Sequence, residues 1–195
     1  MKIKKWILMS AFLAPVCASF CVACSKEIKP YQYAKYKVKW PFNVIDGDTI
    51  YFDNGSKRQG IRIFGIDTPE TYKSFQVDKN KQLAKLENFY GVLAKELLIK
   101  KLWQKDITIR YITQDKYNRW VCRIFDENNY DIGKYIISQG LARIQYFSLN
   151  KKDKWYWIND SELKGYYYEL LKTQQSAQSQ LLGFWKENIN DVYHK

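Results

Sequence analysis

Histidine and cysteine are nearly absent from the part of this chain that can fold. The one histidine is His194, beside the C-terminus, and three of the four cysteines (Cys17, Cys21, Cys24) lie in the first 24 residues. Cys122 therefore has no partner for a disulfide within the domain, and no Cys/His cluster for zinc can form. The shortage excludes the usual zinc hydrolases, Ser-His-Asp triads and Cys-His proteases. Any metal must be a hard cation such as Ca²⁺ or Mg²⁺, held by oxygen ligands.

Acidic residues are also few compared with basic ones. The 195 residues carry 32 Lys and Arg against 20 Asp and Glu, a net charge of +12. Three of the positive charges (Lys2, Lys4, Lys5) lie in a predicted targeting segment, and the rest of the chain stays strongly basic. This balance favours a polyanionic partner, either nucleic acid or an anionic membrane surface, although charge can also serve solubility alone. The length leaves room for one domain of about 150 residues.

The N-terminus has the form of a signal peptide. Residues 1–5 are basic and residues 6–20 are apolar, a run too short to span a membrane comfortably. Small residues precede Cys24 and a polar run follows it, which resembles the lipobox of bacterial lipoproteins. The resemblance implies cleavage after residue 23 and a diacylglycerol thioether on Cys24. Residues 24–36 would then tether a domain over 37–195 to the extracellular face of the cell membrane. Ordinary secretion with a free Cys24 is the alternative.

Periodicity and turn signals favour an α+β domain. Asn54-Gly55 predicts a tight hairpin between two strands. Residues 70–88 are polar and predict a long loop with some helix. Alternating patterns predict strands at 37–40, 49–53, 60–66, 107–112 and 120–125. Helical spacing and a cap at Asp131 predict helices at 91–103, 131–140 and 161–185. Five strands with helices inserted late suggest a small β-barrel.

Acidic residues gather at two strand ends. Asp46 and Asp48 flank a glycine at a turn that enters a strand, and Asp67 and Glu70 follow another strand. The proline after Thr68 fixes that turn and leaves the Thr68 carbonyl free to point at a ligand. Each aspartate alone is most simply a turn residue. Together, the oxygens of this pattern could converge on one hard cation.

Two arginines accompany the acids. Arg62 lies in a predicted strand whose neighbours Ile61 and Ile63 point the other way, and Arg119 stands at the start of another strand. A phosphodiester that passes through a five-coordinate state gains negative charge on its equatorial oxygens. A guanidinium fork matches that charge. Either arginine taken alone could equally be part of a surface ion pair.

Three separated motifs together resemble the staphylococcal nuclease family. They are Val-Ile-Asp-Gly-Asp-Thr at 44–49, Arg-x-x-x-Ile-Asp-Thr-Pro-Glu at 62–70, and Asp-Lys-Tyr-x-Arg at 115–119. Residues 140–143 resemble the family's segment after its second helix, so the resemblance covers about residues 38–187. It implies a five-stranded OB-type β-barrel with three helices. It also implies a calcium-dependent endonuclease that cleaves DNA and RNA and leaves 3′-phosphates.

The resemblance also assigns roles to residues. Asp48 and Asp67 would bind Ca²⁺ through their side chains and Thr68 through its carbonyl, with Asp46 in or beside that ligand shell. Glu70 would contact the attacking water as the family's proposed general base. The residues that would hold the phosphate are Arg62 and Arg119, and those that match nucleotide-contacting positions are Lys116, Tyr117 and Tyr146.

The chain also departs from the family pattern. Ser148 stands where the family has a second base-stacking tyrosine, and Trp155, Tyr156 and Trp157 are candidates to replace that ring. Packing of these rings on the third helix is the simpler expectation. We expect the nuclease to be monomeric. The main rival to it is a non-catalytic OB-fold surface lipoprotein that binds single-stranded nucleic acid.

Overall fold

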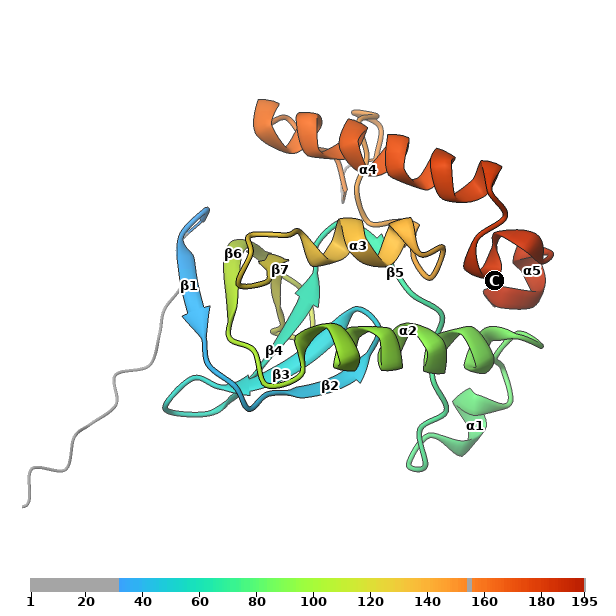
Figure 1. The fold of residues 1–195 in the computed structure, drawn as a ribbon, viewed down its shortest axis with the longest axis horizontal. Helices are drawn as coiled ribbons and strands as arrows, with labels where there is room; N and C mark the ends of the chain where they lie inside the picture. The colour runs from blue at the N-terminus through green and yellow to red at the C-terminus, as the bar shows by residue number, and fades with distance from the viewer. Residues whose placement is uncertain (1–31, 154–155, 195) are drawn as a thin grey trace, which may run out of the picture.

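The computed structural model describes residues 32–153 and 156–194 as a mixed α and β fold (Figure 1). The predicted signal segment (1–23), Cys24 and Trp155 lie outside the described residues. Within the described part of the chain, no helix is both long and apolar enough to cross a membrane. The signal, tether and domain boundaries therefore stay predictions.

Eight strands occur among the described residues, six in one sheet and two in a small pair. The sheet has the order β1-β6-β7-β4-β3-β2, antiparallel throughout except for the parallel pair β4 and β7. The six strands are β1 (Lys35–Val38), β2 (Asn43–Asp46), β3 (Thr49–Asp53), β4 (Arg58–Ile63), β6 (Ile107–Gln114) and β7 (Trp120–Phe125). The pair consists of β5 (Ile66–Asp67) and β8 (Arg143–Ile144).

Strand β2 was missed by the sequence analysis, and it changes how the sheet is built. β2 is only four residues long and its pairing with β3 is interrupted by a register shift between Val44 and Asp46, so it carries no clear alternation. β1 and β2 lie at opposite edges of the sheet but are joined directly by residues 39–42. A flat six-stranded sheet would hold its edges about 24 Å apart, whereas this link spans at most about 18 Å. The sheet must therefore curve; its closure into an OB-type barrel stays a prediction.

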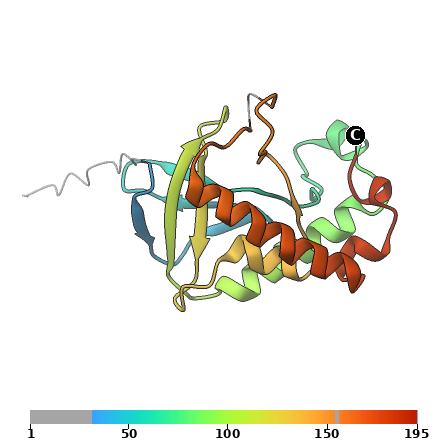
Figure 2. The ribbon, with the colours of Figure 1, turned by 90° about the horizontal axis from the view of Figure 1, so that it is seen from above.

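Three longer helices cover the sheet, as expected, with different ends. They are α2 (Glu87–Leu102), α3 (Ile132–Ser138) and α4 (Ser161–Ser179), and α4 packs along α3 (Figure 2). The predicted cap is confirmed, because the Asp131 carboxylate accepts a hydrogen bond from the Lys134 backbone N–H at 3.0 Å. The shorter helical segments are α1 (Val77–Asn80), the 3₁₀ helix η1 (Gly183–Lys186) and α5 (Ile189–Val192).

The hydrophobic core lies between the sheet and these helices. Ile50 and Ile61 from β3 and β4, Leu98 from α2 and Ile136 from α3 are fully buried. Along β3 and β4 every second side chain enters this core, so the alternate positions face outward. The core thus fixes the strand ends that carry the acidic residues.

Candidate active site

The predicted acids and Arg62 come together where β2, β3, β4 and β5 end or begin. Thr49 at the start of β3 lies directly opposite Arg62 of β4. The turn between Asp46 and Asp48 approaches α2 so closely that a Cβ on Gly47 would lie 2.5 Å from the Ala94 Cβ. The glycine therefore lets the core helix set the position of this turn.

Arg62 bridges the two aspartates predicted to bind a metal. Its Nη2 atom lies 3.0 Å from Asp48 Oδ2 and 2.9 Å from Asp67 Oδ1. A second guanidinium, from Arg143, lies 3.0 Å from the other oxygen of Asp67. Both carboxylates are buried, with Asp48 3% and Asp67 7% exposed. The result is a compact group of opposite charges that is largely shielded from water.

Burial raises the pKa of Asp67 from its ordinary 3.8 to about 6. The negative charge of nearby Asp48 acts in the same direction, whereas Arg62 and Arg143 oppose the shift. The ionised form of Asp67 is thus costly in this position, and an added cation would reduce that cost.

This shift predicts a specific pH dependence of stability without metal. Because the folded-state pKa lies above the ordinary value of 3.8, the folded protein binds this proton more tightly than the unfolded chain does. The free energy of unfolding should therefore fall by up to about 3 kcal/mol as the pH rises from about 4 to about 6. The free energy of unfolding of Asp67→Asn should not show this decrease, because the asparagine side chain carries no charge at any pH.

Urea unfolding of both proteins at pH 4 and pH 7 in metal-free buffer measures the effect. The wild-type protein should lose stability relative to Asp67→Asn between the two pH values. An identical change in the two proteins would show that Asp67 does not titrate as described.

Glu70 and Asp46 share a lysine that the sequence analysis did not single out. Lys73 Nζ lies 2.7 Å from Glu70 Oε2 and 2.9 Å from Asp46 Oδ2. Burial lowers the pKa of Lys73, but its hydrogen bonds to Glu70 and Asp46 outweigh this and raise it. Asp46 also accepts a hydrogen bond from the Thr71 hydroxyl at 2.6 Å. The sequence does place a lysine three residues after Glu70, which could have indicated this ion pair. It was not recognised because it lies in a lysine-rich stretch that was predicted as a loop.

The turn at 115–119 brings Arg119 to the same site. Its Nε atom donates to Asp115 at 2.7 Å, and Nη1 lies 3.5 Å from the Thr49 hydroxyl oxygen. That hydroxyl donates to Asp48 at 2.8 Å, so the turn is linked to the acidic group. Tyr117 is 67% exposed, and the Lys116 ammonium and Arg119 guanidinium both lie against its ring.

A pair of half-exposed tyrosine rings lies beside Arg62. The Arg62 guanidinium is 4.8 Å from the centre of the Tyr146 ring, and the Tyr156 ring centre is 5.3 Å from that of Tyr146. The backbone N–H of Ser148 donates to the Tyr156 carbonyl at 2.8 Å, which holds the loop in this position. Tyr156, one of the three proposed replacements for the missing ring, thus lies next to Tyr146. Its role in stacking stays a prediction.

Tyr193 is a further residue of the site that the sequence analysis missed. Its hydroxyl donates to the Asp67 carbonyl at 2.9 Å, and the Arg143 guanidinium lies 3.6 Å from the centre of its ring. The side chain is buried at the end of α5. The next residue, His194, contacts the buried Glu87 carboxylate through its backbone N–H and its ring. No sequence pattern connects these positions, which lie far apart in the chain.

The donors of this site suit a hard cation. Asp48 and Asp67 supply buried carboxylates, and the buried hydroxyl oxygen of Thr68 has no hydrogen-bond partner. Residues 32–153 and 156–194 contain no group of three or more Asp, Glu, His or Cys side chains arranged to hold a metal. A cation here would therefore need a backbone carbonyl and water besides the two carboxylates, a mixture that Ca²⁺ accepts.

The sequence of this chain is similar to those of several known proteins. A sequence model described as "Staphylococcal nuclease homologue" matches residues 60–187. The chain is 32% identical to the thermonuclease of Staphylococcus hyicus over 124 residues, 60% of this chain and 63% of that protein. It is 29% identical to the thermonuclease of Staphylococcus intermedius over 150 residues, 73% of each chain. An uncharacterized protein of Methanocaldococcus jannaschii is 27% identical over 161 residues, 75% of this chain and 70% of that protein.

Proposed function

The chain belongs to the staphylococcal nuclease family, and on this basis we propose that it is a calcium-dependent endonuclease that hydrolyses DNA and RNA to products with 3′-phosphates. Membership of the family implies a nucleic-acid substrate. The observation that carries the proposal is the convergence of Asp48 and Asp67 on one nitrogen of Arg62. This group provides cation-binding oxygens and a phosphate-binding guanidinium in the same place.

The proposed Ca²⁺ site consists of the Asp48 and Asp67 carboxylates and the Thr68 carbonyl, with Asp46 in or beside the ligand shell. When bound, the ion would polarise a phosphoryl oxygen and orient water. Asp46 is held by Thr71 and Lys73, so it is already oriented before any ion arrives.

The chain's own residues supply the rest of the proposed chemistry. Arg62 and Arg119 donate hydrogen bonds to the scissile phosphate and stabilise the charge that develops on it. Glu70, 42% exposed and paired with Lys73, accepts the proton of the attacking water. The substrate strand beside the reacting phosphate is contacted by Lys116, Tyr117 and Tyr146.

We extend the proposal to the fold and the location. The curved sheet whose edges are joined by residues 39–42 is proposed to be the family's OB-type barrel. The signal-like N-terminus supports a lipoprotein that is anchored through Cys24 on the extracellular face of the cell membrane, and the protein is proposed to be a monomer. Labelling of cells with a radioactive fatty acid tests the anchor, because the label should enter the wild-type protein and not Cys24→Ser.

The activity is tested by calcium removal. The purified protein should degrade single- and double-stranded DNA and RNA with Ca²⁺, lose this activity in excess EGTA, and regain it when Ca²⁺ is restored. Mass spectrometry of a cleaved oligonucleotide should identify 3′-phosphate ends. Cleavage that persists in EGTA would contradict the calcium site.

A non-catalytic single-strand binding protein is the second candidate. It is favoured by the exposed rings of Tyr117, Tyr146 and Tyr156, which could stack on bases without any reaction. Binding of oligonucleotides without cleavage under either Ca²⁺ or Mg²⁺ would identify it.

A further inference from the structure

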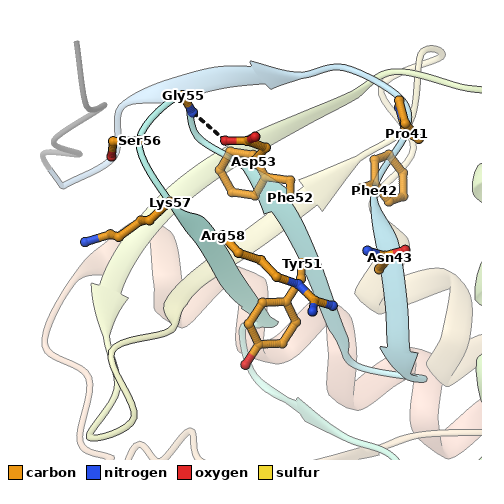
Figure 3. Close-up of a pocket in the computed structure, with 10 residues that line it drawn as sticks. All are labelled: Pro41, Phe42, Asn43, Tyr51, Phe52, Asp53, Gly55, Ser56, Lys57 and Arg58. Carbon is orange, nitrogen blue, oxygen red and sulfur yellow. Dashed lines mark hydrogen bonds between the residues drawn. The ribbon is translucent and has the colours of Figure 1, made fainter. Parts of the chain in front are cut away.

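The outer face of the β3–β4 hairpin continues from the proposed catalytic site. Directly opposite residues of an antiparallel pair point to the same side of the sheet. Tyr51 lies opposite Gly60, between the Thr49–Arg62 pair at the site and the Asp53–Arg58 pair near the hairpin tip. Since Ile50 and Ile61 point into the core, these pairs face outward. Figure 3 shows Tyr51 and Arg58 side by side on this surface, which we call the hairpin face (Tyr51, Arg58 and Gly60).

Gly60 makes the hairpin face continuous with the site. A Cβ at this position would lie 3.0 Å from the Arg119 Cγ atom and 3.0 Å from the Tyr51 ring. A side chain at this position would have to displace these two neighbours by a few tenths of an ångström. Because glycine is present, the Arg119 and Tyr51 side chains both lie close over this position, so the hairpin face continues to Arg119.

Arg58 is the residue of the hairpin face that is free to bind an anionic ligand. Its exposed guanidinium lies 4.8 Å from the centre of the Tyr51 ring. Across residues 32–153 and 156–194, Arg58 forms no ion pair, whereas the other five arginines each pair with a carboxylate. Asp53, opposite Arg58, instead accepts a hydrogen bond from the Gly55 backbone at 2.8 Å. A guanidinium held over an aromatic ring can still contact a phosphate or stack on a base.

A hollow of about 390 Å³ lies at the far end of the hairpin face. It opens between the hairpin and residues 41–43, and Arg58 and Tyr51 form part of its wall (Figure 3). Its volume falls within the range of small-ligand sites, so it has room for one nucleotide. Arg58 and Arg62 are four residues apart on one strand, about 13 Å, so they would contact different nucleotides.

From these observations we propose that the hairpin face binds a single strand of nucleic acid where it continues beyond the scissile phosphate. Arg58 contacts a phosphate or base of that continuing strand, and the Tyr51 ring holds the guanidinium in place. The inference rests on the proposed nuclease function, because that function defines the scissile phosphate. Binding of nucleic acid to the hairpin face does not itself require cleavage. Continuity with Arg119 and the alternation of rings and cations favour a polynucleotide over other anionic partners.

The test compares long and short substrates in the full-length protein, purified in nonionic detergent. Arg58→Ala removes the proposed contact. Lys172→Ala on α4 is the control, because it removes the same charge from an exposed position outside this face. Affinity for a fluorescent 20-nucleotide single-stranded DNA is measured by anisotropy in EGTA at several salt concentrations. Cleavage of the same DNA and of a dinucleotide is then measured with Ca²⁺.

Arg58→Ala should weaken binding of the 20-mer at least about fivefold. It should reduce the slope of log affinity against log salt by about 0.7. KM should rise for the 20-mer and stay unchanged for the dinucleotide, which is too short to reach Arg58. Lys172→Ala should change none of these values.

Three results would overturn the inference. They are an unchanged 20-mer affinity in Arg58→Ala, an equal loss in Lys172→Ala, and an equal loss on the dinucleotide. After reconstitution without detergent, reduced binding of Arg58→Ala to phosphatidylglycerol vesicles with unchanged DNA affinity would make the face a membrane surface instead. If the wild-type protein cleaves neither substrate but Arg58→Ala still weakens 20-mer binding, the nuclease proposal fails and this inference stands.

Discussion

Replacement of Glu70 by glutamine is expected to lower the rate of DNA cleavage by about 10²- to 10⁴-fold. An amide has nearly the same shape as the carboxylate but cannot accept the proton of the attacking water. The Glu70 side chain is 42% exposed, so the change leaves the core packing untouched. Lys73 keeps its partner Asp46 in the variant, which preserves the local arrangement. Initial rates at saturating Ca²⁺ give the result.

Glu96→Gln is a suitable control for this measurement. Glu96 is exposed on α2, and its replacement makes the same change of charge and shape away from the site. Circular dichroism and thermal unfolding should be alike in the wild-type protein and both variants. A wild-type rate in Glu70→Gln would remove Glu70 from the chemistry and leave its pairing with Lys73 as a structural contact.

Arg62→Ala is expected to reduce cleavage by about 10²- to 10³-fold, because it removes a preorganised donor to the charge that develops on the phosphate. It also leaves Asp48 and Asp67 without the cation that now bridges them. The metal-free variant should therefore unfold at a lower temperature near pH 7. Added Ca²⁺ should raise its melting temperature by more than it does for the wild-type protein, since the ion replaces the lost charge.

Arg123→Ala separates this effect from a general loss of stability. Arg123 is as buried as Arg62, with 14% of each side chain exposed, and it also forms an ion pair, with Asp131. Its replacement should destabilise the fold without a specific loss of cleavage or a larger response to Ca²⁺. If both variants lose cleavage and stability in parallel, Arg62 acts on the fold and not on the phosphate.

Local signals predicted most of the elements that carry the site. The Asn54-Gly55 hairpin and the Asp131 cap depend on a few adjacent residues, and both occur where the sequence indicates. The acids at two strand ends also lie close together around Arg62, although their roles are still to be tested. These features could be predicted from the sequence, because each depends on adjacent residues or on two strands that pair directly. Residues at the ends of paired strands lie close together in space.

Other features depend on contacts that no local pattern encodes. The helix predicted to reach residue 185 ends at Ser179, because the chain turns through positive φ angles at Leu181 and Gly183. A Cβ on Gly183 would lie 2.1 Å from the Gly140 carbonyl oxygen, so this turn is shaped by a distant segment. Lys73 was similarly hidden, because it lies in a loop and its partner Asp46 lies at the end of β2, 27 positions earlier.

The hydrogen bond from Tyr193 to Asp67 has a consequence for the order in which the site is assembled. The two residues are 126 positions apart, so Asp67 is synthesised long before Tyr193. At usual translation rates that interval is about 6 to 25 s. During this time the Asp67 carbonyl lacks the hydroxyl that later binds it, and Arg143, once it is made, lacks the Tyr193 ring. The backbone position that carries the proposed calcium-binding carboxylate of Asp67 is thus among the last parts of the site to be fixed on a growing chain.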